Sequence, residues 1–350
     1  TLDELIGRVD LLDVDAAVGH WKTQGLDLSN ILAVSANPAD SALRQMVSQN
    51  HGLDEALDRQ KLIPAAEPAL VKGEKVTISS PIRNVNRTVG TMLGHEVVKR
   101  QGLPPGTIEV DLQGSAGQSF GAFLPTGIDL YLTGDANDYL GKGLSGGRII
   151  VRPAPDATFA AEDNMIAGNV IGYGATSGQI FLSGLVGERF AVRNSGAHMV
   201  VEGVGDHALE YMTGGVVVIL GRTGRNLAAG MSGGTAYVLD LKPHKLTDGA
   251  LASGALLTDT LDELEARGDK DSEMVIDLIQ RHVAETWSRV GADLLSALEE
   301  DRTATLRRIT RLVPADYARM NAALAKAKAQ GRDYHEPAVW SQIYKEATRG

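Results

Sequence analysis

Leu144-Ser145-Gly146-Gly147-Arg148-Ile149-Ile150-Val151 places a small hydroxyl residue and two glycines directly before a short run rich in apolar residues. Segments 176–182, 212–219 and 231–238 have the same form. A glycine turn that repeatedly leads into a short strand is typical of a solenoid, in which each unit buries its apolar face only by stacking on the next. The repeat therefore predicts a stacked β fold, and it does not resemble an active site.

The spacing of these turns predicts the size of one coil. The glycine turns are separated by 31 residues (Gly147 to Gly178), 37 residues (Gly178 to Gly215) and 19 residues (Gly215 to Gly234). These separations are near multiples of a coil of roughly 16–20 residues, so the first two gaps are each expected to hold an extra coil. Strand-like runs occur at 108–112, 128–132, 148–152, 179–182, 189–193, 197–202, 216–220 and 235–239. The predicted fold class is mainly β: a single-stranded right-handed parallel β-helix (a solenoid) with helical N- and C-terminal flanks.

Glycine suits the corners of such a solenoid because it adopts positive φ without the penalty that a Cβ atom imposes. Stacked coils also bring like corners together, where small residues fit best. Ser145, Ser177, Thr213 and Ser232 are therefore expected to stack and to form hydrogen-bond ladders. The predicted structural glycine turns are Gly117, Gly121, Gly141, Gly143, Gly146, Gly147, Gly172, Gly174, Gly178, Gly214, Gly215, Gly230, Gly233 and Gly234.

The flanks differ in pattern from the repeat, and the chain is divided into a helix/loop segment (1–75), a β-helix domain (76–245) and a C-terminal helical segment (246–350). Helices are predicted at 40–47 and 53–59, with Pro64 and Pro68 breaking the residues after them, then a strand at 76–80 and one helix over 86–101. Further helices are predicted at 259–267, 272–298 and 303–330, with a break at Pro314. Helices are expected to cover the open end of the solenoid.

Composition excludes several classes of function. The chain contains no cysteine, which removes disulfides, thiolate metal sites and a cysteine nucleophile, and fits a reducing, cytoplasmic setting. A net charge of −10 makes general nucleic-acid binding an unsuitable role. No apolar run reaches the roughly 20 residues needed to cross a bilayer, so no membrane partner is expected. The start at Thr1, without a signal-peptide pattern, suggests a fragment or processed product.

Two motifs imitate ligand loops. Gly141–Gly146 matches G-x-G-x-x-G by its letters, but a strand follows it where a dinucleotide-binding turn needs a helix, so we interpret it as a structural corner. The run from Gly134 to Asp138 resembles part of a calcium loop, but it lacks the bidentate acid, and Asx turns explain it equally well.

Several polar residues remain as weaker candidates. Arg83, Asn84, Asn86 and Arg87 precede a predicted helix and would either bind an anion at its N-terminus or dock the helix; we favour docking, with Asn86 as the helix cap. The histidines form no metal-binding pair. The acids Glu162, Asp163 and Glu188 show no paired register for glycoside hydrolysis. No catalytic, cofactor-binding or metal-binding residue is predicted.

Several longer stretches occur in a familiar order: 82–94, 114–123, 134–147 and 164–178. Together they resemble the C-terminal GXGXG domain of the glutamate synthase large (alpha) subunit, over about residues 60–245. The resemblance implies a right-handed β-helix within an enzyme that makes L-glutamate from L-glutamine and 2-oxoglutarate with FMN, a 3Fe–4S cluster and NAD(P)H. It also implies partners: the amidotransferase and FMN domains of the same large subunit, and the small (beta) subunit.

The resemblance predicts a structural scaffold that holds the amidotransferase and FMN/synthase domains in place and is not catalytic by itself. No cofactor is expected in this chain. The alternative is a separately encoded GXGXG subunit of another redox complex, similar to the one in formylmethanofuran dehydrogenase. A third, weaker interpretation is a self-contained enzyme such as a sugar-active β-helix.

Overall fold

The computed structural model describes residues 1–34, 42–251 and 253–348 and divides into two units, Thr1–Leu53 and Asp54–Gly350. The described residues of the first unit form the short helices α1 (Leu2–Leu5), η1 (Val9–Leu11), α2 (Val14–Val18) and α3 (Ser29–Leu32). None of these helices contains a buried residue. The helix predicted over 40–47 is wrong for residues 42–47, which are not helical; its first two residues lie outside the described part.

The second unit begins with helical turns that the sequence indicates only in part. These are η2 (Leu53–Glu55, which spans the division), η3 (Asp58–Leu62, a π-helix), α4 (Ile63–Ala65) and α5 (Glu67–Lys72). Pro64 and Pro68 do not end the helical structure as predicted. They lie in the first turns of α4 and α5, where the missing N–H of proline needs no partner.

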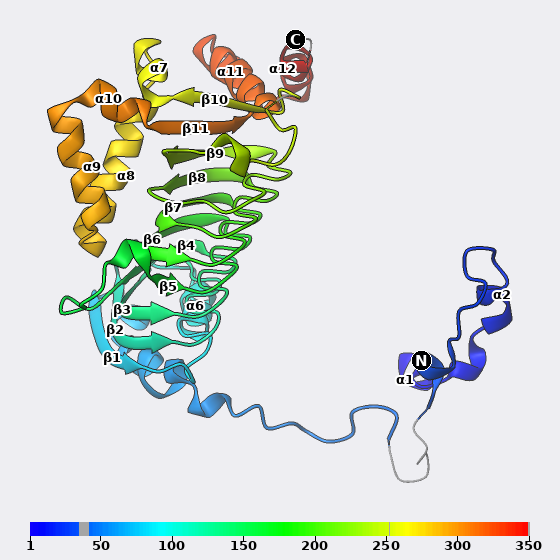
Figure 1. Ribbon diagram of the computed structural model, residues 1–350. Coiled ribbons are helices and arrows are strands. Elements are labelled where there is room, and N and C mark those ends of the chain that lie inside the picture. Colours follow the sequence, from blue (N-terminus) through cyan, green and yellow to red (C-terminus); the bar gives the residue numbers. More distant parts are fainter. Residues whose placement is uncertain (35–41, 252, 349–350) are drawn as a thin grey trace. The chain divides into compact units, whose positions relative to one another are not determined.

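Parallel strands stack one on another along the second unit, as Figure 1 shows. They are β1 (Val76–Ile82), β2 (Ile108–Ala116), β3 (Ile128–Ala136), β4 (Ser145–Arg152), β6 (Ser177–Val186), β7 (Ser195–Gly203), β8 (Thr213–Ile219) and β9 (Gly233–Leu239). Register places buried apolar residues in columns: Ile149 pairs with Ile180, and Ile180 with Met199. The predicted β-solenoid is thus confirmed.

The coil count from glycine spacing is half right. β7 lies between β6 and β8, so the second gap does contain an extra coil. The first gap does not, because β4 pairs directly with β6. Residues 153–164, which include η4 (Ala161–Asp163), loop out of the stack before β5 (Met165–Ala167) pairs with β6. Spacing alone cannot distinguish a looped-out insertion from another coil.

At the corners of the solenoid, every second residue has a positive φ, which a strand does not have. Tyr139, Gly141 and Gly143 have φ of 62°, 64° and 64°. The N–H groups of Tyr139 and Gly143 donate to Asn169 and Tyr173 on the next coil, whereas that of Gly141 donates to Phe120 on the previous coil. The N–H groups along the corner therefore bond alternately to the next coil and to the previous coil. The predicted strand at 189–193 is wrong for this reason, since Arg189, Ala191 and Arg193 repeat the pattern with φ of 62°, 56° and 57°.

The helix expected at 86–101 is shorter than predicted. It is α6 (Thr91–Lys99), whose N-cap is Gly90 rather than Asn86. Its predicted apolar face is buried through Leu93 and Val97. Gly102 ends it as expected, with φ of 88° and its N–H bonded to the Val97 carbonyl.

The C-terminal segment contains strands that the sequence pattern does not predict. After η5 (Pro243–Lys245) come β10 (Leu256–Thr260), α7 (Leu261–Ala266), α8 (Asp271–Thr286), α9 (Arg289–Glu300), α10 (Arg302–Arg307), β11 (Ile309–Pro314), α11 (Ala315–Ala329) and α12 (Pro337–Thr348). The helix predicted over 272–298 is divided by Trp287 in the left-handed region and by the N-cap Ser288.

The edge of β9 is covered by strands rather than by the helices that the sequence predicts there. The antiparallel strand β11 pairs with β9, and β10 pairs with β11 (Figure 1). α8 packs beside the sheet, where it contacts β4, β6 and β7, whereas α7 contacts β10 and β11 and α11 contacts β11. Backbone pairing satisfies the edge donors and acceptors of β9 more completely than a helix would.

Candidate docking groove

The glycines singled out from the sequence lie in the turns and loops between strands or in the first residues of strands, and they suit these places for two different physical reasons. Those with positive φ are Gly121, Gly141, Gly143, Gly146, Gly172, Gly174, Gly178, Gly215, Gly230 and Gly234. The remaining ones, Gly117, Gly147, Gly214 and Gly233, have other φ values but stand against the neighbouring coil. A Cβ atom on Gly214 or Gly233 would overlap the carbonyl oxygen of Ser195 or Thr213. The second group thus permits close stacking.

Ser145, one of the hydroxyl residues named from the repeat, bonds to the backbone of the preceding coil. Ser145 stacks in register on Ser177, but its Oγ donates to the carbonyls of Phe123 and Leu124, both at 3.4 Å. Ser195 likewise donates to the Ala175 carbonyl at 3.3 Å. The predicted hydroxyl ladder is therefore wrong: among the described residues, the side chains of Ser177, Thr213 and Ser232 form no hydrogen bond.

The two motifs that imitate ligand loops are parts of this scaffold. β4 begins at Ser145, inside the G-x-G-x-x-G match, and no helix follows. In the calcium-like run, Asp135 Oδ2 accepts from Ser115 Oγ at 3.1 Å, and Asp138 Oδ1 accepts from the Asn169 N–H at 2.7 Å. Within the described ranges, no group of three or more His, Asp or Glu side chains is placed to hold a metal ion.

The N-terminus of α6 is occupied by a carboxylate of the protein itself, that of Asp58. The buried carboxylate of Asp58 accepts hydrogen bonds from the N–H groups of Gly90, Met92 and Leu93, at 2.9 to 3.1 Å. Burial raises the pKa of Asp58, and these backbone bonds oppose the rise. This end of α6 is therefore filled, which removes the anion-binding alternative there.

Asn84 and Asn86 dock their turn onto neighbouring coils, although they do not cap α6. The Asn84 Oδ1 atom accepts from Asn137 Nδ2 at 3.0 Å, and the Asn86 carbonyl accepts from the Gly117 N–H at 3.1 Å. Arg83 and Arg87 are exposed. Docking, the favoured interpretation of this cluster, agrees with these contacts.

The remaining candidate acids and histidines are mostly dispersed. Glu162 forms an ion pair with Arg289, while Asp163 and Glu188 are exposed. His20, His51, His95, His244 and His335 are exposed, and His198 and His207 are half-buried. His282 is the exception, because it is fully buried beside Glu202.

A buried polar cluster joins the solenoid to the helices. Glu202 Oε1 on β7 accepts hydrogen bonds from Ser183 Oγ at 3.1 Å and from Ser288 Oγ at 2.5 Å. His282 Nε2 on α8 lies 3.5 Å from the same oxygen. Nearby, Arg148 on β4 pairs with Asp129 at 2.9 Å and with Glu285 on α8. Burial raises the pKa of Asp129, and Arg148 opposes the rise. These contacts fix the position of α8.

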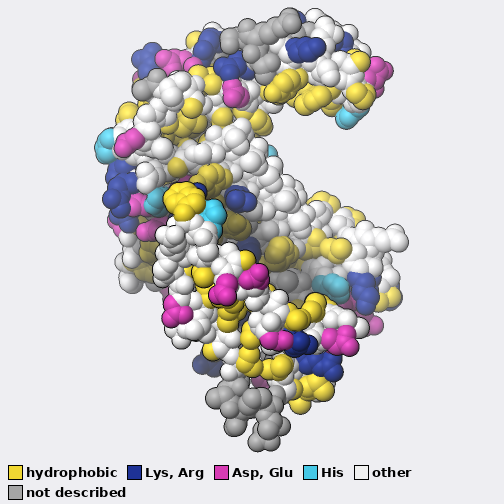
Figure 2. All heavy atoms as spheres, turned by 90° about the vertical axis from the view of Figure 1, so that its right-hand side faces the viewer, with side chains coloured by type: hydrophobic (Ala, Val, Ile, Leu, Met, Phe, Trp, Pro, Cys, Tyr) yellow, Lys and Arg dark blue, Asp and Glu magenta, His cyan; other side chains and the backbone are white. Residues whose placement is uncertain are grey.

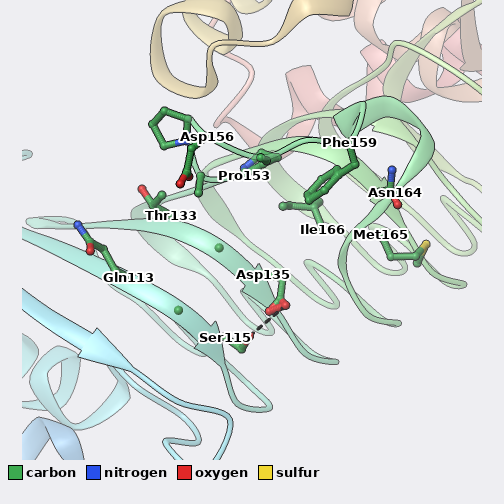
Figure 3. Close-up of a pocket in the computed structure, with 15 residues that line it drawn as sticks. Gln113, Ser115, Thr133, Asp135, Pro153, Asp156, Phe159, Asn164, Met165 and Ile166 are labelled. Atoms are coloured by element: carbon green, nitrogen blue, oxygen red, sulfur yellow. Dashed lines mark hydrogen bonds between the residues drawn. The ribbon is translucent and has the colours of Figure 1, made fainter.

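A groove of about 970 Å³ lies at the ends of β2 and β3. Its walls are 113–115, 133–135, the looped-out residues 153–157 with Phe159, and 164–166. Figure 3 shows Ser115 and Asp135 joined on neighbouring strands, with Phe159 reaching in from the loop. Phe159 and Met165 are 51% and 55% exposed. We name this hollow the β2–β3 groove.

The lining of the β2–β3 groove is mainly uncharged. Its titratable lining residues are Asp135 and Asp156, and no histidine, lysine or arginine lines it. Exposed apolar side chains beside a few polar groups are typical of a surface that contacts another protein.

Comparison with known proteins identifies the fold family. A family model described as the GXGXG motif matches residues 58–314. The chain belongs to the GXGXG family. It is 44% identical over 348 residues to the glutamate synthase [NADPH] large chain of Bacillus subtilis (strain 168), covering 97% of this chain and 22% of that protein. It is 46% identical over 322 residues to the glutamate synthase [NADH] of Schizosaccharomyces pombe, covering 91% and 15%.

A third relative is the ferredoxin-dependent glutamate synthase 2 of Synechocystis sp., 43% identical over 304 residues, or 85% of this chain and 19% of that protein. The resemblance to the glutamate synthase large subunit, drawn from the stretches 82–94, 114–123, 134–147 and 164–178, is confirmed. This GXGXG chain spans about a fifth of the length of these relatives.

The face of this GXGXG chain that Figure 2 shows carries charges of both signs. In the view of Figure 2, Lys and Arg side chains are dispersed among acidic and hydrophobic ones rather than gathered into one field. No helix among the described residues is long and apolar enough to cross a membrane.

Sequence reasoning missed Asp58, the Glu202 cluster and the β2–β3 groove. Ser288 lies far from Glu202 along the chain, and Asp58 far from Gly90. No local pattern indicates such pairs. The proline-rich run at 153–155, between two predicted strands, was the available signal for a looped-out segment.

Proposed function

We propose that this chain is the scaffold domain of a glutamate synthase large chain, which holds an amidotransferase domain and an FMN/synthase domain in place for L-glutamate formation. The observation that carries the proposal is the similarity to glutamate synthase large chains over 97% of this chain. That similarity includes both helical flanks, which a separately encoded GXGXG subunit would not need to share. We therefore favour the scaffold over that alternative.

The β2–β3 groove is the proposed contact with those domains. It lies on rigid, in-register strands, so an occupant would be held in a fixed position relative to the stack. Phe159 and Met165 offer apolar anchors, which contribute most of the free energy at protein interfaces. We propose that the chain itself performs no chemistry and holds no FMN, 3Fe–4S cluster or NAD(P)H.

The test uses the full-length large chain with Phe159→Ala and Met165→Ala together. We expect glutamine-dependent glutamate formation to fall several-fold, while glutamine hydrolysis and glutamate formation from added ammonia stay unchanged. Val98→Ala, an equally exposed apolar residue on α6 outside the groove lining, is the matched control. Equal coupled activity in the double variant and the parent would show that the groove is not the contact.

A titration of the 350-residue chain with FMN tests the second part of the proposal. We expect no saturable change in the flavin spectrum. Saturable binding would contradict a purely structural role.

The remaining expectations stay predictions. These are the division at 1–75, 76–245 and 246–350, the small (beta) subunit as a partner, and a cytoplasmic setting. Limited proteolysis of the full-length protein, followed by mass spectrometry of the fragments, tests the division.

A further inference from the structure

A second cavity lies at the other end of the stack, after the last residues of β8 and β9. It measures about 410 Å³ and is lined by 220–223, 238–242 and Lys245. This volume is at the lower end of the range for small-molecule sites. Its lining carries three cationic side chains, Arg222, Lys242 and Lys245, in a protein whose net charge is −10.

The single carboxylate in this lining is already engaged. Asp240 accepts hydrogen bonds from Arg308 Nε at 3.1 Å and from Arg308 Nη2 at 2.7 Å. Arg308 thereby lowers the pKa of Asp240, with a smaller contribution from Lys242. Asp240 stays charged and interacts chiefly with Arg308 and more weakly with Lys242.

The three cations lack ion-pair partners in the part of the chain that the structure describes. No carboxylate there lies within 4.0 Å of Arg222, Lys242 or Lys245. Arg225, only three residues after Arg222, is more typical of this protein, since it pairs with Asp206 at 2.8 Å. Like charges gathered without counterions repel one another, and a bound anion would remove that repulsion.

The backbones of these residues are tied to the solenoid, while the side chains of Arg222 and Lys242 are exposed. The Arg222 carbonyl accepts from the Val204 N–H at 2.9 Å, which ties it to the preceding coil. The Lys245 N–H donates to the Lys242 carbonyl at 2.9 Å, and the Lys245 carbonyl accepts from the Leu227 N–H at the same distance. Residues anchored in this way lose less entropy when they bind a ligand.

We propose that this cavity binds a small oxyanion with more than one negative charge, of the phosphate or polycarboxylate class. Guanidinium and ammonium groups recognise both kinds of oxygen, Arg222 through paired N–H donors and the lysines as point charges. The proposal concerns a different surface from the β2–β3 groove and does not depend on the scaffold role.

The test is isothermal titration of the 350-residue chain with inorganic phosphate and, separately, with citrate, at constant ionic strength. Saturable binding of one or both is expected, and the stronger of the two identifies the class. Arg222→Gln with Lys242→Gln is expected to weaken it at least tenfold, while Arg225→Gln leaves it unchanged. Added NaCl should also weaken it.

A second measurement keeps the proposal open to refutation if the double variant does not fold. In the unaltered chain, the bound anion should slow acetylation of Lys242 and Lys245 by an amine-reactive reagent, while the exposed Lys72 reacts as before. The absence of saturable heat, or equal affinity in the folded double variant, would overturn the proposal. Equal acetylation with and without the anion would do the same.

Discussion

Glu202 Oε1 lies 3.5 Å from His282 Nε2, and both side chains are shielded from solvent between the solenoid and α8. The second carboxylate oxygen of Glu202 and both ring nitrogens of His282 have no hydrogen-bond partner within the described ranges. The stabilisation of this buried pair therefore depends on the contact between Glu202 and His282 and on the hydroxyls of Ser183 and Ser288.

Glu202→Ala should therefore destabilise the protein by about 3 kcal/mol, because it leaves buried polar groups without a partner. Equilibrium urea denaturation followed by circular dichroism measures the loss. Glu202→Gln retains an acceptor oxygen and should lose less. Arg225→Ala breaks an exposed pair and should cost less than about 1 kcal/mol. A similar small loss in Glu202→Ala would mean that the cluster contributes little.

The ion pairs of Asp259 on β10 predict how the free energy of unfolding changes in acid. Burial alone would raise the pKa of Asp259, but hydrogen bonds from Arg267 and Arg311 outweigh it and lower the pKa. The unfolded value is about 3.9. The stabilisation is therefore fully present above that value and is lost as pH falls through the lower, folded pKa.

Urea midpoints of the unaltered chain and of Asp259→Asn, measured from about pH 7 to about pH 3, test this sign. We expect the two proteins to differ by a constant amount above about pH 5 and to converge towards about pH 3. A difference that grows on acidification would show that the folded-state pKa of Asp259 is not lowered.

Two alanine substitutions, at Gly174 and Gly214, distinguish the free-energy cost of a positive φ from that of close stacking. Gly174 has φ of 63°, but a Cβ atom there would meet nothing within 4 Å, so Gly174→Ala should cost only about 1–2 kcal/mol. Gly214→Ala should cost about 3 kcal/mol, because its Cβ atom would overlap the Ser195 carbonyl of the previous coil. Thermal denaturation of both variants gives the comparison, and the reverse order would contradict the stacking argument.

Asp58→Ala should destabilise the N-terminus of α6. The change leaves the N–H groups of Gly90, Met92 and Leu93 without their acceptor, and we expect a loss of about 2 kcal/mol. Hydrogen exchange of these amides should accelerate more than that of the Val218 amide in the distant strand β8. Unchanged exchange at Gly90 would indicate that another group satisfies these donors.

The repeated part of this fold could be predicted from the sequence because its determinants are local. A glycine, a hydroxyl and an apolar run lie within eight residues of one another at Leu144–Val151, and the same geometry recurs coil after coil. β6, β7 and β8 follow that rule. The segment 189–193 resembles a strand in sequence because Phe190, Ala191 and Val192 form a short apolar run, but its φ values alternate in sign.

The features that the sequence does not predict depend on partners distant along the chain. β11 falls within a predicted helical region because it is short and lies between charged helical segments, and only its pairing with β9 and β10 makes it a strand. The β2–β3 groove arises where β3 and the residues after β4 enclose a common space. No periodicity within either segment indicates that space.

The alternating corners also limit how the molecule can change in length. Because each corner bonds to the coil before it and to the coil after it, one whole coil is the smallest unit that can be inserted or removed without leaving unpaired N–H groups. Each such event would shift everything beyond it by one strand spacing, about 4.8 Å. The distance between the β2–β3 groove and the cavity after β8 and β9 can therefore change only in steps of one strand spacing. Gene duplication within the repeat would lengthen it by one or more such steps.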